Sequence, residues 1–390
     1  MIENFTNFAN PNETFMIYRD LEKSIAKAIK PAKAVILYGA RRVGKTVLLE
    51  NIVKSHTGKT VLLNGEDFST QDLFKERTAA NYRQILTGVD LLVIDEAQNI
   101  PQIGNVIKFI TDHIKTIAVL ASGSSSFDLQ NQIGEPLVGR ATTFHLFPFS
   151  LHEFSKHENR IETTQRLEER LVYGTYPELS SIEDFQDKQT YLHEIAVSYL
   201  LKDILSIDGI KNSSKMRDLL RLIAYQVGSM VSYEELAKQL ALSRNTVEKY
   251  MDLLTKTFII YRLPAFSRNH RKEVTKAGKW FFVDNGIRNA LIGDFRPVSL
   301  RQDIGILWEN FVIGERIKQA SNNRKIVQFY FWRTYSGQEI DLIEEENTSL
   351  RTFECKWTAK KIKIPSTFAE MHNNVPFDLI HKANFLDFLV

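Results

Sequence analysis

The feature that most constrains this chain is a glycine-rich stretch that lies between an apolar run and a helical pattern. Residues 39–46 read GARRVGKT, which fits the pattern G-x-x-x-x-G-K-[ST]. The apolar residues 34–38 predict a buried strand, and apolar side chains recur at helical spacing from Val43 onward. Glycines in such a loop let backbone N–H groups face phosphate oxygens at a helix N-terminus. An accidental glycine-rich turn would not require the flanking strand and helix, so the sequence predicts a site for nucleotide phosphates.

Each residue of this loop has an expected role toward ATP. Lys45 is expected to reach the β- and γ-phosphates, and the Thr46 hydroxyl is expected to bind Mg²⁺. The rest of the loop is expected to surround the phosphates: Gly39, Ala40, Arg41, Arg42, Val43 and Gly44. ATP and Mg²⁺ are therefore the predicted ligands of the loop.

An acidic pair follows a second apolar run. Residues 91–94 are Leu-Leu-Val-Ile, and Asp95 and Glu96 come directly after them. Open α/β sheets bind ligands at the carboxyl ends of their strands. Asp95 is expected to hold the Mg²⁺ shell, while Glu96 is expected to orient and deprotonate the attacking water. A solvated turn is the alternative for such a pair, and its combination with the glycine-rich loop favours the catalytic interpretation.

Three more residues are candidates for action at the γ-phosphate. Ser122 and Ser124 follow the apolar run 117–121 and could bring a hydroxyl there, although plain turns have the same composition. Arg140 is a candidate arginine finger, because developing charge on the γ-phosphate favours a guanidinium. Such an arginine acts on its own nucleotide or on that of a second copy, and the second case predicts a homo-oligomer. The alternative for Arg140 is an ordinary surface arginine.

The middle of the chain carries a helix-turn-helix pattern. Glu234–Leu240 predicts a short helix, and Arg244–Thr257 predicts a second one with Ser243 as its N-cap. The following basic residues predict a β-wing: Arg262, Arg268, Arg271, Lys272, Lys276 and Lys279. In a DNA-binding winged helix, Arg244, Asn245 and Lys249 would read bases and the wing would contact phosphates. A lid or protein-contact module is the alternative for the same fold.

Acidic residues and a lysine recur near the C-terminus at strand spacing. Glu354 and Lys356 point to one face of a predicted strand, Asp341 lies on the strand before it, and Glu309 lies on the preceding helix. The set is similar in order and type to the PD-(D/E)xK nuclease signature, and it could hold a second Mg²⁺ or Mn²⁺. Cross-strand ion pairing is the alternative.

Taken as whole motifs, the chain resembles the prokaryotic AAA-type ATPases that are fused to a C-terminal domain of unknown function. The stretches that carry the resemblance are YGARRVGKT, LLVIDEAQNIP, ASGSSSFDL, LVGRATTFHLFPFSLHEF, YGTYPEL, KWFFVDNGI and FWRTYSGQEIDLI. They span nearly the whole chain. The resemblance implies that Arg140 is the arginine-finger candidate and that the C-terminal domain has a nuclease-like fold. It also weakens the DNA inference, since AAA-type ATPases often use a winged helix as a lid.

Composition limits the partners. Fifty basic and 47 acidic residues leave a net charge of +3, so a nucleic-acid site must be a local patch. A single cysteine, a start without a secretory pattern and the lack of a long apolar run predict a cytoplasmic protein with no membrane partner.

These observations predict an α/β protein in three parts: a P-loop parallel-sheet ATPase domain (1–155), a helical and winged-helix region (156–295) and a small α/β restriction-endonuclease-like domain (296–390). Two functions fit them. One is ATP-dependent processing of DNA or RNA by a tethered nuclease. The other is a nucleotide switch whose C-terminal domains bind partners or DNA without cutting.

Overall fold

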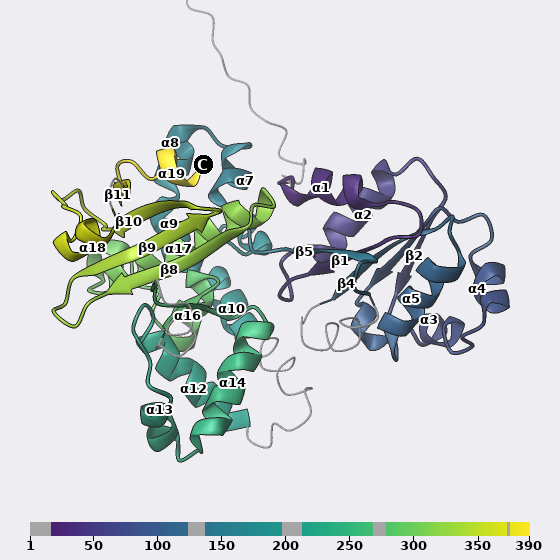
Figure 1. Cartoon of the computed structure of the whole chain (residues 1–390), viewed down its shortest axis with the longest axis horizontal. Coiled ribbons are helices and arrows are strands. Elements are labelled where there is room, and N and C mark those ends of the chain that lie inside the picture. The colour runs from purple at the N-terminus through teal and green to yellow at the C-terminus, as the bar shows by residue number, and fades with distance from the viewer. Residues whose placement is uncertain (1–16, 124–136, 197–212, 268–277, 373–374) are drawn as a thin grey trace, which may run out of the picture.

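The structure is a computed structural model, and it describes residues 17–123, 137–196, 213–267, 278–372 and 375–390. Figure 1 shows one sheet and its helices on one side, with a helical region and a second sheet on the other. Within these ranges, every helix is too short or too polar to cross a membrane.

The N-terminal domain is built on a parallel sheet with the strand order β2-β3-β4-β1-β5. Its strands are β1 (Ala34–Tyr38), β2 (Thr60–Asn64), β3 (Leu91–Asp95), β4 (Ala118–Gly123) and β5 (Ala141–His145). Its helices are α1 (Leu21–Ala28), α2 (Lys45–Ser55), α3 (Phe68–Leu73), α4 (Ala79–Ile85), the 3₁₀ turn η1 (Ala97–Asn99) and α5 (Ile103–His113).

Alternate residues of one strand enter two different cores. Val35 and Leu37 pack in the core that includes α1 and α2, while Ile36 and Tyr38 pack in the core that includes α4 and α5. This is the consequence of the two-residue side-chain period of a strand that is covered on both faces. The predicted parallel sheet with helices on both sides is therefore confirmed.

The parallel direction of the strands decides which loops meet. The carboxyl ends of β1, β3 and β4 lie at the same end of the sheet, so the loop after Tyr38 lies near Asp95 and Ser122. Ala34 pairs with Ala141 at the opposite end of the sheet, where β1 and β5 begin. Arg140, which precedes β5, therefore lies at the end of the sheet that is opposite to the glycine-rich loop.

A helical region follows. Its elements are α7 (Leu151–Ser155), α8 (Arg160–Gln165), α9 (Leu167–Tyr173), η2 (Pro177–Ser180), α10 (Phe185–Glu194), α12 (Ser213–Tyr225), α13 (Tyr233–Leu240), α14 (Arg244–Lys256), β6 (Ile260–Leu263), β7 (Lys279–Phe282), α16 (Asn285–Ile292) and η4 (Val298–Leu300). The predicted helix-turn-helix corresponds to α13 and α14, and Ser243 accepts a hydrogen bond from Thr246 N as the N-cap of α14. Strands β6 and β7 pair in antiparallel fashion directly after it.

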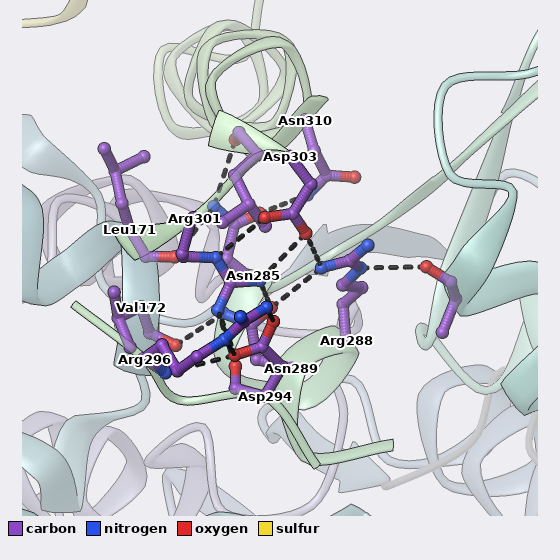
Figure 2. A network of polar contacts seen from close by, with 12 residues as sticks. Leu171, Val172, Asn285, Arg288, Asn289, Asp294, Arg296, Arg301, Asp303 and Asn310 are labelled. Carbon is purple, nitrogen blue, oxygen red and sulfur yellow. Dashed lines mark hydrogen bonds and ion pairs between the residues drawn. The ribbon is translucent and has the colours of Figure 1, made fainter. Parts of the chain in front are cut away.

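A buried polar network fixes α16 against its neighbours (Figure 2). Asn289 donates to the carbonyl of Val172 at 2.7 Å, and Arg288 contacts the Asp303 carboxylate at 2.6 Å. Arg301 contacts the same carboxylate and the Asn289 side chain. Buried polar groups are costly unless they are paired, so this network specifies how α9, α16 and the start of α17 pack.

The C-terminal domain combines one long helix with a mixed sheet in the order β11-β10-β9-β8. Its elements are α17 (Ile304–Asn322), β8 (Val327–Arg333), β9 (Glu339–Glu346), β10 (Ser349–Cys355), α18 (Ser366–Met371), β11 (Phe377–Ile380) and α19 (Leu386–Leu389). Strands β8, β9 and β10 are antiparallel, and β11 runs parallel to β10. Sequence analysis did not predict β11.

Helix α17 also joins the C-terminal domain to the helical region and to the segment that leads into it from β5. Glu315 accepts a hydrogen bond of 2.7 Å from the backbone N–H of Leu151. Lys318 donates to the Phe149 carbonyl at 2.9 Å and to the Thr175 hydroxyl at 3.0 Å. These groups are buried and mutually paired, so they form a defined junction between α17 and the segments around α7 and Thr175.

Candidate nucleotide site and C-terminal carboxylate cluster

The glycine-rich loop has a shape that two glycines make possible. A Cβ at Gly39 would lie 2.4 Å from the Leu146 carbonyl oxygen, and Gly44 has φ +89°. Lys45 begins α2 and is 5% exposed, and its Nζ donates to the carbonyls of Gly39 and Ala40 at 3.1 and 3.0 Å. The loop therefore wraps around the lysine at the N-terminus of a helix, where anions are favoured.

Asp95, at the end of β3, connects Thr46 at the start of α2 to Ser122 near the end of β4. The Thr46 hydroxyl donates to Asp95 Oδ2 at 2.6 Å, and the Ser122 hydroxyl donates to Asp95 Oδ1. Asp95 Oδ1 also accepts from the backbone N–H of Glu96 at 3.0 Å. The carboxylate is thus fixed in orientation, with Thr46 and Asp95 presenting oxygen atoms side by side.

Glu96 lies in a strained backbone conformation at the end of β3. Its φ of +48° falls in the left-handed region, and a Cβ at Gly65 would lie 2.4 Å from the Glu96 carbonyl oxygen. Its Oε2 accepts a hydrogen bond of 2.6 Å from the side chain of Gln98. A non-glycine residue at positive φ is uncommon and often marks a functional position.

A pocket of about 720 Å³ opens beside these residues. Residues of the loop line it together with Asp95 and Glu96. Pro177 and Glu178 of the helical region line it from η2, and Glu178 lies 3.8 Å from the Arg42 guanidinium. Sequence analysis did not assign these residues, although they lie within the stretch YGTYPEL.

Arg19 is another pocket residue that sequence analysis missed. Its guanidinium is buried, pairs with Glu153 at 3.0 Å and donates to the carbonyl of Val43 at 3.3 Å. Burial lowers the pKa of Arg19, against the raising effect of the Glu153 carboxylate. This contact ties the backbone of the glycine-rich loop to α7. No local sequence pattern identifies it, because it depends on a contact over more than a hundred residues.

The candidates for action at the γ-phosphate occupy different places. The Ser122 hydroxyl is fully buried behind Asp95 and is absent from the pocket lining, so it orients the carboxylate and does not face the pocket. Ser124 lies outside the described residues. Arg140 lies at the amino-terminal end of β5, opposite to the glycine-rich loop, and pairs with Asp112 at 2.7 Å. Action of Arg140 on the nucleotide of its own chain is therefore ruled out by the direction of β5.

At the C-terminus the structure brings the predicted residues together. Lys356 Nζ lies 3.2 Å from Asp341 Oδ2 and 2.7 Å from Glu354 Oε1. Asp341 also accepts a hydrogen bond of 2.9 Å from Cys355 N, and a pocket of about 440 Å³ is lined by Glu309, Asp341 and Lys356. The predicted alternation along β10 is seen, because Phe353 and Cys355 are buried on the other face.

A second lysine enters this cluster from the helical region. Lys279, the first residue of β7, lies 2.9 Å from Glu309 Oε1 and 2.6 Å from Glu339 Oε1. Burial raises the pKa of Glu309 to about 7, although Lys279 opposes this shift. Burial alone would lower the pKa of Lys279, but the carboxylates of Glu309 and Glu339 outweigh it and raise this pKa. Lys279 was predicted as a wing residue, and its place in this cluster was not foreseen.

The cluster as arranged does not fit a metal ion. Over the part of the chain that the structure describes, no three His, Cys, Asp or Glu side chains are grouped so as to hold one. Two ammonium groups lie between the carboxylates, where a cation would bind. All four predicted residues are ion-paired: Lys356 pairs with Asp341 of the neighbouring strand and with Glu354 of its own segment, and Glu309 of α17 pairs with Lys279.

The predicted base-reading residues Arg244, Asn245 and Lys249 are exposed on α14. Arg244 pairs with Glu234 of α13 at 2.9 Å. The wing residues Arg268, Arg271, Lys272 and Lys276 lie outside the described residues.

Comparison with known families divides the chain into three matched segments. Residues 31–155 match the AAA domain, residues 164–297 match a domain of unknown function (DUF8612), and residues 304–384 match another (DUF4143). The parallel-sheet domain matches the AAA family. This match agrees with the glycine-rich loop and the acidic pair at its strand ends, and it supports ATP binding and hydrolysis.

Relatives span most of the chain. A protein of Mycobacterium tuberculosis, described as uncharacterized, is 26% identical over 345 residues, which are 87% of this chain and 74% of that protein. An uncharacterized protein of Methanocaldococcus jannaschii is 24% identical over 356 residues, which are 86% of this chain and 76% of that protein.

Among solved structures, a STAND signal-transduction ATPase of Pyrococcus horikoshii aligns with a TM-score of 0.31 and 15% identity, and the match covers 79% of this chain but only 46% of that one. RuvB of Thermotoga maritima aligns with a TM-score of 0.30 and 16% identity over 66% of this chain and 94% of that one.

Proposed function

We propose that this chain binds ATP with Mg²⁺ and hydrolyses it at the pocket beside the glycine-rich loop. One observation carries the proposal: Thr46 at the start of α2 and Asp95 at the end of β3 hold their oxygens 2.6 Å apart at a pocket that Lys45 also lines. The pair fits Mg²⁺, which binds through oxygen ligands and one or two carboxylates. When bound, the ion would neutralise charge on the β- and γ-phosphates.

The roles of the protein groups follow from their positions. Lys45 exchanges its bonds to the loop carbonyls for bonds to phosphate oxygens, and the helix N-terminus adds backbone N–H donors. Glu96, anchored by Gln98, orients a water and accepts its proton. Ser122 keeps Asp95 in the orientation that Thr46 requires.

Loss of the lysine tests this function most directly. Lys45→Ala removes the cation nearest to the phosphates, so ATP turnover should fall by at least about 10²-fold. The exposed Lys54 at the end of the same helix provides the matched control, Lys54→Ala. Turnover of the Lys45→Ala protein at the rate of the control would refute the site.

We infer further that nucleotide binding is communicated to the C-terminal domains. Pro177 and Glu178 line the pocket, and two residues earlier Thr175 contacts both Asp284 and Lys318. Lys318 lies on α17, the helix that also carries Glu309. A ligand that displaces Glu178 from Arg42 would therefore act on a segment that is joined to α17 through buried polar contacts.

Cleavage or binding of nucleic acid at the C-terminal cluster is the second candidate function. The convergence of Asp341, Glu354 and Lys356 on adjacent strands favours cleavage, since these residue types bind and polarise a phosphodiester. The insertion of Lys279 between Glu309 and Glu339 favours the non-cleaving switch, because the carboxylates are already neutralised. Incubation of labelled DNA and RNA with ATP and Mg²⁺ or Mn²⁺ decides between cleavage and the non-cleaving switch. Breaks that disappear in Lys356→Ala support cleavage, and intact strands support the switch.

A further inference from the structure

A second, strongly cationic pocket lies far from the nucleotide site. It has a volume of about 300 Å³ and lies at the amino ends of β1 and β5, at the end of the sheet opposite to the glycine-rich loop. Five basic side chains line it, together with the hydroxyl-bearing Ser24 and Thr142. The basic residues are Lys27, Lys30, Lys33, Arg140 and Arg324. We call this site the cationic pocket.

Hardly any of this positive charge is compensated. No carboxylate lines the pocket within the described ranges, and the nearest partner of its cations is Asp112, which pairs with Arg140. Lys33 donates to the carbonyl of Gly139 at 3.0 Å. In the same ranges, Lys27 and Lys30 have no acidic partner. Like charges that gather without counter-charges repel one another and attract an anion.

Helix stabilisation does not account for the cluster. Lys27 lies in the last turn of α1, where a cation favours the helix dipole, but this effect falls off within one turn. Lys33 and Arg140 precede strands, and Arg324 follows α17 of the C-terminal domain. The Arg324 guanidinium lies 4.8 Å from the centre of the Phe144 ring, which holds it over the N-terminal domain. Cations from two domains therefore share one surface.

We propose that the cationic pocket binds the phosphodiester backbone of a nucleic acid. A nucleic-acid backbone carries one negative charge per nucleotide, and Lys and Arg are the side chains that neutralise it. Lys27 lies at the end of α1, and Lys30 and Lys33 lie in the segment between α1 and β1, so one short stretch of chain brings three cations to the pocket. Five cations from two domains on one surface suit a polyanion, which carries several negative charges close together.

This inference deepens the nucleic-acid part of the proposed function and does not depend on ATP hydrolysis. It supplies the local patch that the small net charge requires. It also gives Arg140 a role on its own chain that does not involve the γ-phosphate. Because the pocket includes Arg324, a bound strand would contact the N-terminal and C-terminal domains at once.

Binding of labelled single- and double-stranded oligonucleotides to the full chain, measured by fluorescence anisotropy without nucleotide, tests the proposal. The double variant Lys27→Gln/Lys30→Gln should weaken binding by about 20- to 60-fold at about 0.1 M salt. The slope of log K against log salt, measured between about 50 and 200 mM, should fall by about 1.4 for single strands or 1.8 for duplex. The matched control is Lys23→Gln/Lys54→Gln, which removes two exposed lysines outside the pocket. Thermal melting establishes that both variants are folded.

The outcomes separate cleanly. A loss confined to the pocket variant, with the smaller salt slope, supports the proposal. Equal binding by the two double variants overturns it. So does a pocket variant that binds oligonucleotides normally but loses self-association in sedimentation, since the anion would then belong to a second copy. A chain that binds nucleic acid through this pocket yet fails to hydrolyse ATP would refute the proposed ATPase function and leave this inference intact.

Discussion

The Lys279 ammonium lies 2.9 Å from Glu309 Oε1, and the two residues belong to different parts of the chain. Lys279 starts the strand that follows the helix-turn-helix, whereas Glu309 lies on the long helix of the C-terminal domain. A cation from one part thus completes a carboxylate cluster in the other. Truncating either partner would leave a buried charge with less compensation, which costs more than losing an exposed pair.

The first prediction concerns the pH dependence of stability. Glu309 has a pKa of about 7 in the folded chain against 4.5 as its ordinary value. Between these values the folded state keeps the proton that the unfolded state has released, so Glu309 lowers stability as pH rises through this window. The resulting loss in the free energy of unfolding amounts to at most about 3 kcal/mol. The free energy of unfolding of Glu309→Gln, taken as a difference from wild type, should therefore shift in favour of the variant as pH rises from about 5 to about 8, on top of a constant cost for the lost Lys279 contact, measured by urea unfolding.

An exposed glutamate serves as the control for this experiment. Glu370→Gln on α18 should show the same pH profile as wild type. A Glu309→Gln profile parallel to that of wild type over the whole range would contradict the raised pKa of Glu309.

The second prediction separates binding from hydrolysis. Glu96→Gln keeps the shape of the side chain but removes the proton acceptor, while Asp95 retains its bonds to Thr46 and Ser122. Nucleotide affinity should stay within about threefold of wild type, and turnover should fall by about 10²-fold or more. Glu66→Gln, a change at another acidic residue of the same pocket, should leave turnover nearly unchanged. A parallel drop in affinity and turnover would make Glu96 a ligand or a structural residue.

The third prediction tests whether Arg140 acts on a second copy. Because Arg140 lies at the end of its own sheet opposite to the glycine-rich loop, an action at a γ-phosphate requires the nucleotide of another chain. If Arg140 acts on a second copy, Arg140→Ala and Lys45→Ala should each abolish most turnover, by about 10³-fold for the arginine. If Arg140 serves only the cationic pocket, Arg140→Ala should leave turnover nearly unchanged. A mixture of the two should regain activity, since Lys45→Ala supplies the arginine and Arg140→Ala supplies an intact site. Mixtures as inactive as the separate proteins would remove the arginine-finger role.

Local patterns predicted the parts of this structure that local sequence determines. The loop after Tyr38 and the acidic pair at Asp95 follow from a strand, a turn and a helix in succession, and parallel strands bring such ends to one edge. The meeting of Asp341, Glu354 and Lys356 follows from the strand period and one hairpin. These arrangements need only neighbouring elements, and the structure contains them.

Contacts between distant segments could not be predicted in the same way. Pro177 and Glu178 reach the nucleotide pocket because η2 packs against it, and Lys279 reaches Glu309 because β7 packs against α17. The distance between Arg140 and the pocket beside the glycine-rich loop of the same chain depends on the direction of β5, which no motif encodes. Periodicity within one segment contains no information on these pairings, since they depend on how whole domains dock.

The last prediction distinguishes a structural from a catalytic role for Lys356. Its ammonium bridges Asp341 and Glu354, so Lys356→Met leaves two neighbouring carboxylates without a cation and should cost about 1–2 kcal/mol, given that the lysine is 42% exposed. Adding Asp341→Asn removes one of these charges and should restore part of the loss, with a coupling of about 1 kcal/mol in a double-mutant cycle. The exposed pair Lys325–Glu346 provides the control cycle, where coupling should be near zero. If the cluster is purely structural, any strand cleavage by wild type should persist in the restabilised double variant. If Lys356 or Asp341 acts on the phosphodiester, cleavage should stay absent even though stability returns, and Asp341→Asn alone shows whether the loss belongs to Asp341. Absence of coupling between Lys356 and Asp341 would contradict the bridge itself.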